Sequence, residues 1–296
     1  MSQLAPPAPI TLSPVIAGLW RLTTWNLDVP ARVRWIEQAL ELGISSFDHA
    51  DIYGDYRAET LFGEALKAAP ALREKMQLVT KCGIRLRSAE RPYRVNYYDT
   101  TAAYVRSQVE QSLTKLHTER LDLVLIHRPD YLLDAAALAE TFSTLTREGK
   151  VAHWGVSNHR PGQFALLHQH YPLATNQLEL SPLMMDALDD GSLDQAQQLG
   201  LRPMIWSPLG GGRLFSGDDA QALRLRAEMT AIAARLDISV ATLAYAWILR
   251  HPSRPHPITG TRRIEGLREA RAALDVVLDA EDWYAIWAAS KGHPVP

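Results

Sequence analysis

The sequence holds four residues that together could do acid chemistry at a carbonyl group: Asp48, Tyr53, Lys81 and His127. A phenol has a pKa of about 10 and donates protons poorly near neutrality, but a neighbouring ammonium group lowers that pKa by stabilising the phenolate. Tyr53 and Lys81 therefore predict a general acid. Asp48 would hold Lys81 charged and in place, and His127 could polarise the carbonyl or pass a proton to Tyr53. This hypothesis requires all four residues at one site.

Each member of this set also has an ordinary structural interpretation. The aspartate could cap the following helix, the lysine could be a solvated residue at a strand end, and the other two could be half-buried with satisfied hydrogen bonds. Their shared position just past apolar segments favours a catalytic role over these structural roles. The runs ISSFDHADIYG (44–54), MQLVTKCG (76–83) and LDLVLIHRPD (121–130) each carry such residues just past an apolar segment. If these segments are parallel strands, the side chains gather at one end of a sheet, where α/β enzymes place their active sites.

Short apolar runs alternate with helix-patterned segments almost to the C-terminus. In the helical segments apolar residues recur at three and four positions, as in Val33, Ile36 and Leu40. We predict strands at residues 15–18, 43–47, 76–80, 121–126, 152–156, 174–177, 201–205 and 257–258. We predict helices at residues 31–42, 58–67, 101–116, 135–148, 161–168, 192–199, 222–236 and 266–272. Eight such units indicate an α/β fold, a closed (β/α)8 TIM barrel.

Two more helical segments, 240–249 and 282–289, are expected to decorate this barrel. No linker rich in Ser, Gly or Pro divides the chain, so we expect residues 1–296 to form a single domain. A doubly wound open sheet is the alternative fold, but its G-x-G-x-x-G fingerprint is missing at residues 15–21. A nucleotide would then be held elsewhere in the chain.

Composition narrows the class of protein. The chain is 47% apolar and 22% charged with a formal net charge of −2, which is ordinary for a globular protein and unlike a nucleic-acid binder. No stretch of about 18 apolar residues suggests a membrane span, and the N-terminus lacks a signal-peptide pattern. The single cysteine, Cys82, could be reactive beside Lys81, but we expect it to be structural. We therefore expect a cytoplasmic protein.

Six motifs occur together in the order and spacing of a known family. They are FDHADIYG, LVTKCG, LVLIHRPD, GVSN, TNQLELSP and WSPLGGGRLF. Through them the chain resembles the aldo-keto reductases over residues 15–273, and the RPD and GGGRLF segments make it most similar to the bacterial oxidoreductase branch. The resemblance implies a barrel that binds NADPH without a Rossmann domain and reduces aldehydes or ketones to alcohols.

The resemblance also implies a role for each catalytic residue. Tyr53 would donate the proton, Lys81 would lower its pKa, Asp48 would pair with Lys81 and His127 would orient the carbonyl, while the hydride would come from the nicotinamide C4. The cofactor residues it implies are Trp20, Arg21, Ser157, Asn158, Gln177, Trp206, Ser207, Pro208, Leu209, Gly210, Gly211, Arg213, Gly260, Thr261, Arg262 and Glu269.

Among these cofactor residues, Ser157 and Asn158 would bind the carboxamide, Gln177 would support it and Trp206 would stack on the nicotinamide. The three polar residues could equally be partners of backbone groups at turns or strand ends.

The loop at residues 207–213 makes physical sense without the resemblance. Its three glycines let backbone N–H groups turn toward an anion, and Arg213 offers a forked cation for phosphate. A flexible turn is the alternative interpretation. Phosphates often bind after the seventh strand of a barrel, where this loop is expected to lie.

The turn at 260–262 precedes a predicted helix N-terminus, another anion-binding device, and falls where the family grips the adenosine 2′-phosphate. The chain departs from the eukaryotic pattern, since Gly266 stands where Arg is common and Ala270 where Asn is common. Arg262 and Arg263 could replace the lost charge, although they could also be solvated surface residues. We expect NADPH rather than NADH.

Loops are expected to shape the substrate side. Trp20 and Trp25 would line the pocket entrance, unless they are ordinary core or rim aromatics. The segment 83–99 could overhang the same mouth, and its arginines hint at an anionic or polar substrate if they are not simply solvated. The chain ends soon after residue 273, so the pocket is expected to be open and permissive.

Two other functional classes compete with a carbonyl reductase. A non-enzymatic NADPH sensor or regulatory subunit could use the same barrel and keep the same four residues. A metal-dependent hydrolase fits poorly, because the histidines show neither His-x-His nor His-Glu-x-x-His spacing of ligands. We expect a small-molecule carbonyl substrate, no metal, no nucleic-acid partner, no membrane partner, and a monomer or weak homo-oligomer.

Overall fold

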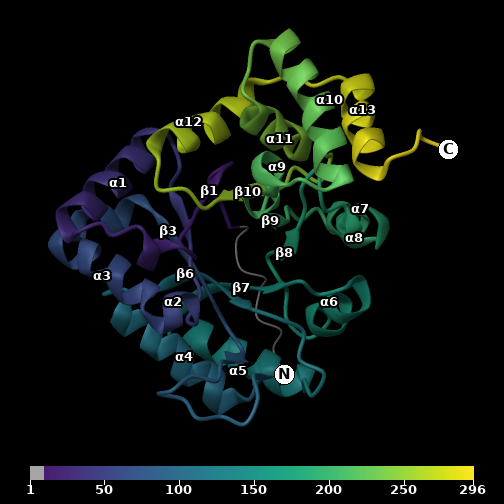
Figure 1. Cartoon of the computed structure of the whole chain (residues 1–296). Helices are drawn as coiled ribbons and strands as arrows, with labels where there is room; N and C mark the ends of the chain where they lie inside the picture. The colour runs from purple at the N-terminus through teal and green to yellow at the C-terminus, as the bar shows by residue number, and fades with distance from the viewer. Residues whose placement is uncertain (1–9) are drawn as a thin grey trace.

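The computed structural model describes residues 10–296, in which eight parallel strands close into a barrel with helices around it (Figure 1). Residues 1–9, part of the expected domain and of the segment searched for a signal peptide, lie outside the described residues. The strand order is β1-β10-β9-β8-β7-β6-β3-β2. Strand β1 pairs with both β10 and β2, which closes the ring. The predicted (β/α)8 barrel is confirmed.

The barrel strands are short and buried. They are β1 (Ile16–Gly18), β2 (Ser46–Asp48), β3 (Gln77–Cys82), β6 (Leu121–Ile126), β7 (Val151–Ser157), β8 (Asn176–Glu179), β9 (Met204–Trp206) and β10 (His256–Thr259). In β6 the side chains alternate between two cores, because successive residues of a strand face opposite sides. Leu123 and Leu125 pack inside the barrel, whereas Val124 and Ile126 pack against the surrounding helices. Burial on both faces explains why these strands read as continuous apolar runs.

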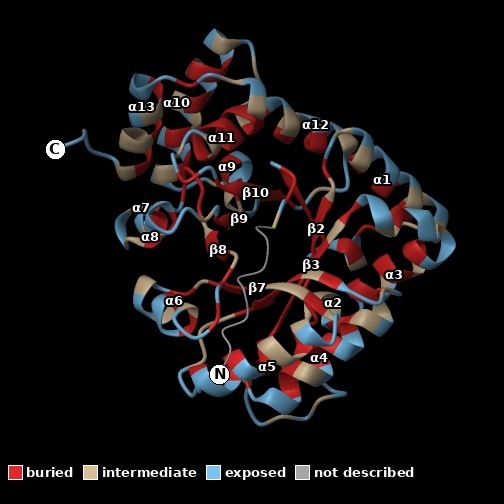
Figure 2. Cartoon of the chain, turned by 180° about the vertical axis from the view of Figure 1, so that it is seen from behind, coloured by how far each residue is buried: buried red, intermediate tan, exposed pale blue. Residues whose placement is uncertain are grey.

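The helices turn buried faces toward the barrel and exposed faces outward (Figure 2). The α-helices are α1 (Val29–Glu41), α2 (Tyr53–Tyr56), α3 (Ala58–Ala68), α4 (Ala102–Lys115), α5 (Ala135–Arg147), α6 (Pro161–His168), α7 (Asp186–Asp189), α8 (Ser192–Gln198), α9 (Arg213–Ser216), α10 (Ala220–Leu236), α11 (Val240–Leu249), α12 (Ile264–Ala272) and α13 (Ala280–Lys291). Short 3-10 turns lie at Leu22–Thr24, Pro70–Lys75, Gly210–Gly212 and Ala273–Asp275. Side-chain caps fix several starts, such as Asp28 for α1 and Asp134 for α5.

A third apolar cluster joins the decorating helices to the barrel. It brings α10, α11 and α13 together with Ile205 of β9. Trp247 and Trp283 stack with ring centroids 4.8 Å apart, and each indole N–H donates to the backbone carbonyl of the other residue. The two decorations predicted at 240–249 and 282–289 are therefore helical and packed. Helix α13 is longer than predicted because Asp279 caps it at its start.

Some sequence-based boundaries are wrong. The run at 43–47 enters β2 only at Ser46, because Gly43 takes a left-handed conformation with φ of 75° after α1. The predicted strands at 174–177 and 201–205 correspond to β8 and β9, which begin and end later. The segment 83–99 holds a small antiparallel pair, β4 (Ile84–Arg85) with β5 (Tyr97–Tyr98).

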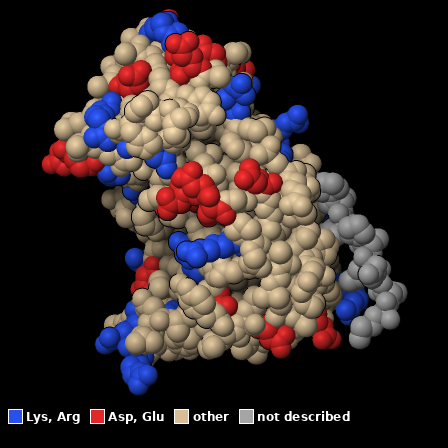
Figure 3. Space-filling model, turned by 90° about the vertical axis from the view of Figure 1, so that its right-hand side faces the viewer, with Lys and Arg blue, Asp and Glu red and all other residues tan. Residues whose placement is uncertain are grey.

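Acidic and basic side chains are interspersed on the face drawn in Figure 3, which agrees with the small net charge. Among residues 10–296, no single helix is both long and apolar enough to cross a membrane. Helices α10 and α11 reach that length and composition only together, and the chain bends by 93° between them.

Candidate functional site

The four candidate catalytic residues meet at the carboxyl end of the barrel, as the sequence predicted. Asp48 ends β2, Lys81 lies near the end of β3 and His127 directly follows β6. Backbone hydrogen bonds tie these ends together, since the N–H of His127 donates to the carbonyl of Cys82 at 2.8 Å. Tyr53 begins the short helix α2 just after β2. Rigid strand ends therefore position the chemistry.

Lys81 is the centre of the cluster. Its buried ammonium donates to both carboxylate oxygens of Asp48 at 2.7 and 2.8 Å and to the backbone carbonyl of His49 at 2.8 Å. It also donates to the hydroxyl oxygen of Tyr53 at 3.0 Å. The phenolic hydrogen is thus left to point away from Lys81. The rings of Tyr53 and His127 are 5.9 Å apart and nearly perpendicular.

Burial and charge act in opposite directions on the Tyr53 phenol. Burial raises its pKa and the Lys81 ammonium lowers it, and the net pKa lies above the ordinary value. Lys81 thus lowers the pKa of Tyr53 in the expected direction, but desolvation of the phenolate outweighs the nearby charge in the net shift. Tyr53 keeps its proton near neutrality, and Lys81 can stabilise the phenolate once that proton has left.

Near neutral pH Lys81 is charged, whereas His127 is neutral. Burial alone would lower the pKa of Lys81, but Asp48 and Tyr53 raise it, and the net shift is upward. Burial, Lys81 and Arg128 lower the pKa of His127 well below its ordinary value. A charged lysine therefore lies beside a neutral imidazole, which can donate a hydrogen bond from a ring nitrogen.

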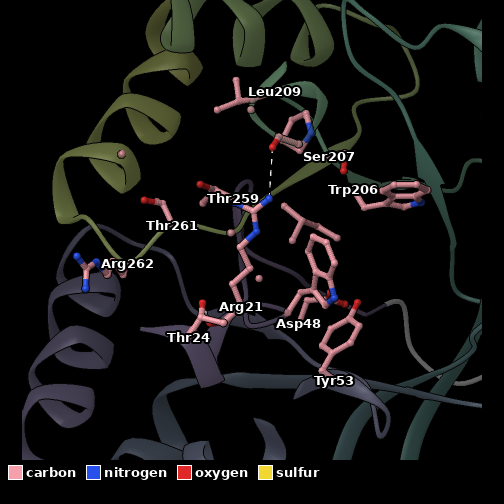
Figure 4. Close-up of a pocket in the computed structure, with 18 of the residues that line it drawn as sticks. Arg21, Thr24, Asp48, Tyr53, Trp206, Ser207, Leu209, Thr259, Thr261 and Arg262 are labelled. Carbon is pink, nitrogen blue, oxygen red and sulfur yellow. Dashed lines mark hydrogen bonds between the residues drawn. The ribbon is translucent and has the colours of Figure 1, made fainter. Parts of the chain in front are cut away.

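A cavity of about 980 Å³ opens beside this cluster. Figure 4 shows Asp48 and Tyr53 at one end, Arg262 at the other and Arg21 between them. The predicted residues that line it are Trp20, Arg21, Asp48, Tyr53, His127, Gln177, Trp206, Ser207, Pro208, Leu209, Gly211, Gly260, Thr261, Arg262 and Glu269. Trp25 lines it as well, although it is mostly buried against Trp35. The cavity falls at the upper end of the range for ligand pockets, about 300–1,000 Å³.

Gln177, Ser157 and Asn158 form a hydrogen-bonded wall behind the catalytic end. The amide of Gln177 donates to Asp48 at 2.8 Å, and the hydroxyl of Ser157 donates to the Gln177 carbonyl at 3.1 Å. Asn158 donates to Ser157 at 2.8 Å and accepts from the Trp206 indole at 3.0 Å. Ser157 and Asn158 do not line the cavity, and their side chains are hydrogen-bonded to each other. Binding of a carboxamide by these two residues therefore stays a prediction.

The glycine loop after β9 is built as predicted, except for its arginine. Gly210, Gly211 and Gly212 have φ of 58°, 66° and 102°, which side chains rarely adopt. Gly211 lines the cavity and accepts a hydrogen bond from Arg21 at 3.3 Å, whereas Gly210 lies outside the lining. Arg213 does not line the cavity, so its contact with a phosphate stays a prediction.

Residues at the start of α10 hold Arg213 outside the cavity lining. Its guanidinium donates two hydrogen bonds to Asp219 at 2.8 and 2.9 Å and a third to Gln221. The same Asp219 caps the start of α10, so the carboxylate is fixed there and draws Arg213 toward it. The sequence pattern did not reveal this competing partner.

The other end of the cavity has an arginine-rich turn before α12. Arg262 donates one hydrogen bond to the Trp25 carbonyl at 3.2 Å, and both Arg262 and Arg263 line the cavity. Gly266 is packed against this turn, since a Cβ there would approach Thr261 to 2.9 Å. The departure from the eukaryotic pattern at this position thus fits the local packing.

Several lining residues were missed by sequence reasoning. The decorating helix α11 contributes Val240, Ala241 and Tyr245, and its cap Ser239 lines the cavity too. No motif signals them, because α11 reaches the cavity through its packing against α10, α12 and β10. Arg128 also lines the cavity, and its position directly after His127 could have revealed it.

Two of the four loop arginines in 83–99 have protein partners for their side chains. Arg85 donates to Asp99 at 2.8 Å and to Tyr93 at 3.0 Å. The guanidinium carbon of Arg91 lies 3.6 Å from the centroid of the Tyr56 ring. None of the four arginines of this segment lines the cavity, although Ile84 and Leu86 do. Any selection for an anionic substrate must therefore come from another cation.

The chain is similar in sequence and in structure to known oxidoreductases. A model of the aldo/keto reductase family matches residues 14–291. Oxidoreductase YdhF of Escherichia coli is 47% identical and covers 99% of this chain and 98% of its own. A 6-dehydroglucose reductase of Agrobacterium fabrum is 40% identical over the whole of both chains. The solved structure of a glycerol dehydrogenase from Gluconobacter oxydans superposes with a TM-score of 0.85 at 25% identity, covering 99% of this chain and 96% of that one.

Proposed function

Because the chain belongs to the aldo/keto reductase family, we propose that it reduces aldehydes or ketones to alcohols with NADPH as cofactor and Tyr53 as proton donor. Family membership makes it an oxidoreductase of carbonyl compounds that depends on a nicotinamide cofactor. The observation that supports the finer proposal is the 3.0 Å contact between the Tyr53 oxygen and the Lys81 ammonium at the cavity wall.

The residues present fit a dinucleotide cofactor. The cavity runs from the catalytic cluster past the positive-φ glycines of the 207–212 loop to Arg262, Arg263 and Glu269. Uncrowded glycines such as Gly211 allow backbone N–H groups to approach a pyrophosphate, and two arginines suit the extra phosphate of NADPH. When bound, the cofactor supplies a hydride from its nicotinamide C4 to the carbonyl carbon.

Residues of the protein stabilise the negative charge that develops on the carbonyl oxygen. Tyr53 and His127 donate hydrogen bonds to that oxygen, and this stabilises the negative charge that develops there. The Tyr53 proton then moves to the oxygen and leaves a phenolate. Lys81 stabilises the phenolate by charge and hydrogen bonding, and Asp48 keeps Lys81 charged. Electrostatic preorganisation by rigid strand ends is the main catalytic device in this proposal.

Replacing Tyr53 by Phe tests the proton donor. We expect turnover of 4-nitrobenzaldehyde or 9,10-phenanthrenequinone to fall by about 10²- to 10⁴-fold, the usual contribution of a general acid. NADPH binding, followed by fluorescence quenching, should be retained because the ring itself remains. Tyr97→Phe is the matched control, since Tyr97 is 41% exposed and outside the cavity lining. Unchanged turnover in Tyr53→Phe would refute the proposed mechanism.

Substrate, location and assembly are also proposals. The name of the Agrobacterium relative supports including an aldehyde derived from a sugar in the first substrate panel. The lone, buried Cys82 is compatible with a reducing compartment, and we propose that the enzyme works in the cytoplasm. We propose a monomer or weak homo-oligomer acting on a small-molecule carbonyl.

A further inference from the structure

Arg128 lies next to the proposed site of carbonyl reduction. It directly follows His127, lines the cavity and is half-buried. Its guanidinium carbon is 5.7 Å from the centroid of the Trp206 ring, and one of its N–H groups donates to the His127 carbonyl at 3.2 Å. Since a guanidinium has five donors in a planar fork, most of its hydrogen-bonding capacity is still uncommitted to the described residues.

The charge of Arg128 is also not neutralised by a close acid. Within the described part of the chain, its guanidinium forms no ion pair at 4.0 Å or less, whereas Lys81 is paired with Asp48. Glu179, at the end of β8, is close enough for the Arg128 charge to act on its pKa, but Glu179 does not line the cavity. Among the described residues, the Arg128 charge at the catalytic end of the cavity thus has no acidic partner within ion-pair distance.

We propose that Arg128 is a specificity-determining residue that favours carbonyl substrates bearing a carboxylate. This inference rests on the proposed function and deepens it. A planar guanidinium binds a carboxylate through two parallel hydrogen bonds, and partial burial strengthens that interaction relative to water. The carbonyl group would lie at Tyr53 and His127 while the carboxylate reaches Arg128. The sequence suggested that arginines of the 83–99 loop select an anionic substrate, and this proposal assigns that role to Arg128 inside the cavity.

A matched pair of aldehydes tests the proposal with the full-length enzyme and NADPH. The pair is 4-carboxybenzaldehyde and methyl 4-formylbenzoate, which differ in charge at one end. We expect the wild type to have the higher kcat/KM for the acid. Arg128→Gln should lower kcat/KM for the acid by roughly 10- to 100-fold and for the ester by less than about threefold, since loss of a buried charge partner is costly. Arg128→Lys should keep part of the preference.

A control variant separates direct contact from long-range attraction. Arg87→Gln removes one positive charge from the neighbouring loop, and Arg87 is exposed and absent from the cavity lining. This variant should leave the acid-to-ester ratio unchanged. Equal kcat/KM values for acid and ester in the wild type, or equal losses for both in Arg128→Gln, would overturn the inference while leaving carbonyl reduction intact.

A binding measurement keeps the inference testable if neither aldehyde is reduced. That result would count against the proposed function alone. Calorimetric titration of 4-(hydroxymethyl)benzoate into the protein with NADP⁺ present should then give binding that weakens at least about tenfold in Arg128→Gln. Equal affinity of wild type and variant, or equal affinity of the wild type for the methyl ester, would overturn the role of Arg128.

Discussion

Two carboxyl groups are buried just behind the proposed catalytic residues. Asp51 is 1% exposed, and within residues 10–296 its side-chain oxygens have no well-formed hydrogen bond, although the Ile52 backbone N–H is close enough to act on the carboxyl. Burial and the neighbouring Glu59 raise the pKa of Asp51 well above its ordinary value. Glu59 accepts a hydrogen bond from Thr80 at 2.7 Å, which satisfies one of its oxygens. Asp51 therefore favours the protonated form and costs free energy when it ionises.

Asp51→Asn should stabilise the protein at pH 8 and much less at pH 5. The folded protein holds a proton on Asp51 that the unfolded chain releases above about pH 4. The free energy of unfolding therefore falls as the pH rises from about 4 toward the raised pKa of Asp51 in the folded protein. The amide cannot ionise, and we expect a gain of about 1–3 kcal/mol at pH 8 in urea unfolding. Asp218→Asn, at an exposed position, should show no such pH dependence. A pH-independent effect of Asp51→Asn would contradict this explanation.

At the residue scale, the sequence predicted which catalytic residues lie close together better than it predicted their pKa values. Asp48, Lys81 and His127 were brought together correctly because parallel strands deliver their carboxyl ends to one side of a barrel. The net pKa of Tyr53 was not predictable, since it depends on how deeply the phenol is buried. The Asp219 partner of Arg213 was hidden for a similar reason: both partners read as ordinary surface charges.

At the scale of elements, two helical glycines show how packing decides the cost of one methyl group. Gly63 in α3 is buried against the end of α4, and a Cβ there would lie 1.8 Å from the backbone oxygen of Lys115. Gly162 in α6 is exposed, and a Cβ there would meet nothing within 4 Å. The two positions share a helical setting and differ in the space around them.

Gly63→Ala should destabilise the protein by about 1–3 kcal/mol or more, because the two helices must move apart to admit the methyl group. Gly162→Ala should be neutral or should stabilise by about 0.5–1 kcal/mol, because alanine favours a helix over glycine. Denaturant unfolding of both variants measures the difference. Similar effects of the two substitutions would show that the α3–α4 contact is not tight.

The elements themselves were largely readable from the sequence. The bounds of β6, α6 and α11 agree with the predicted ranges, because their apolar patterns end at polar residues or at proline. Strands β8 and β9 were placed too early because Ala174 and Leu201 are apolar residues of the preceding turns. The β4–β5 pair was missed, since each of its strands has two residues and leaves no periodic signal.

At the scale of the whole molecule, two core clusters pack against the outside of the barrel strands, besides the cluster that fills the barrel interior. The larger one surrounds β1, β2, β3, β6 and β7, and the second joins β8 and β9 to α10, α11 and α13. Both clusters depend on the same closed ring of strands. We propose that residues 1–296 form a single domain.

A single domain of this kind predicts one cooperative thermal transition by both fluorescence and circular dichroism. NADPH at about 100 times its Kd should shift that one transition upward, equivalent to about 2.7 kcal/mol of added stability. Separate melting of the α10–α13 cluster, seen as a second transition that NADPH does not move, would contradict the proposal.

The burial of Cys82 has a practical consequence. Its side chain is 2% exposed, and burial raises the pKa of its thiol well above the ordinary value, so thiol reagents will scarcely label the native chain. A cysteine introduced at an exposed loop position such as Arg87 would therefore be a unique attachment point for a maleimide dye. Such a probe at the rim could report, in real time, how the entrance responds as ligands arrive and leave.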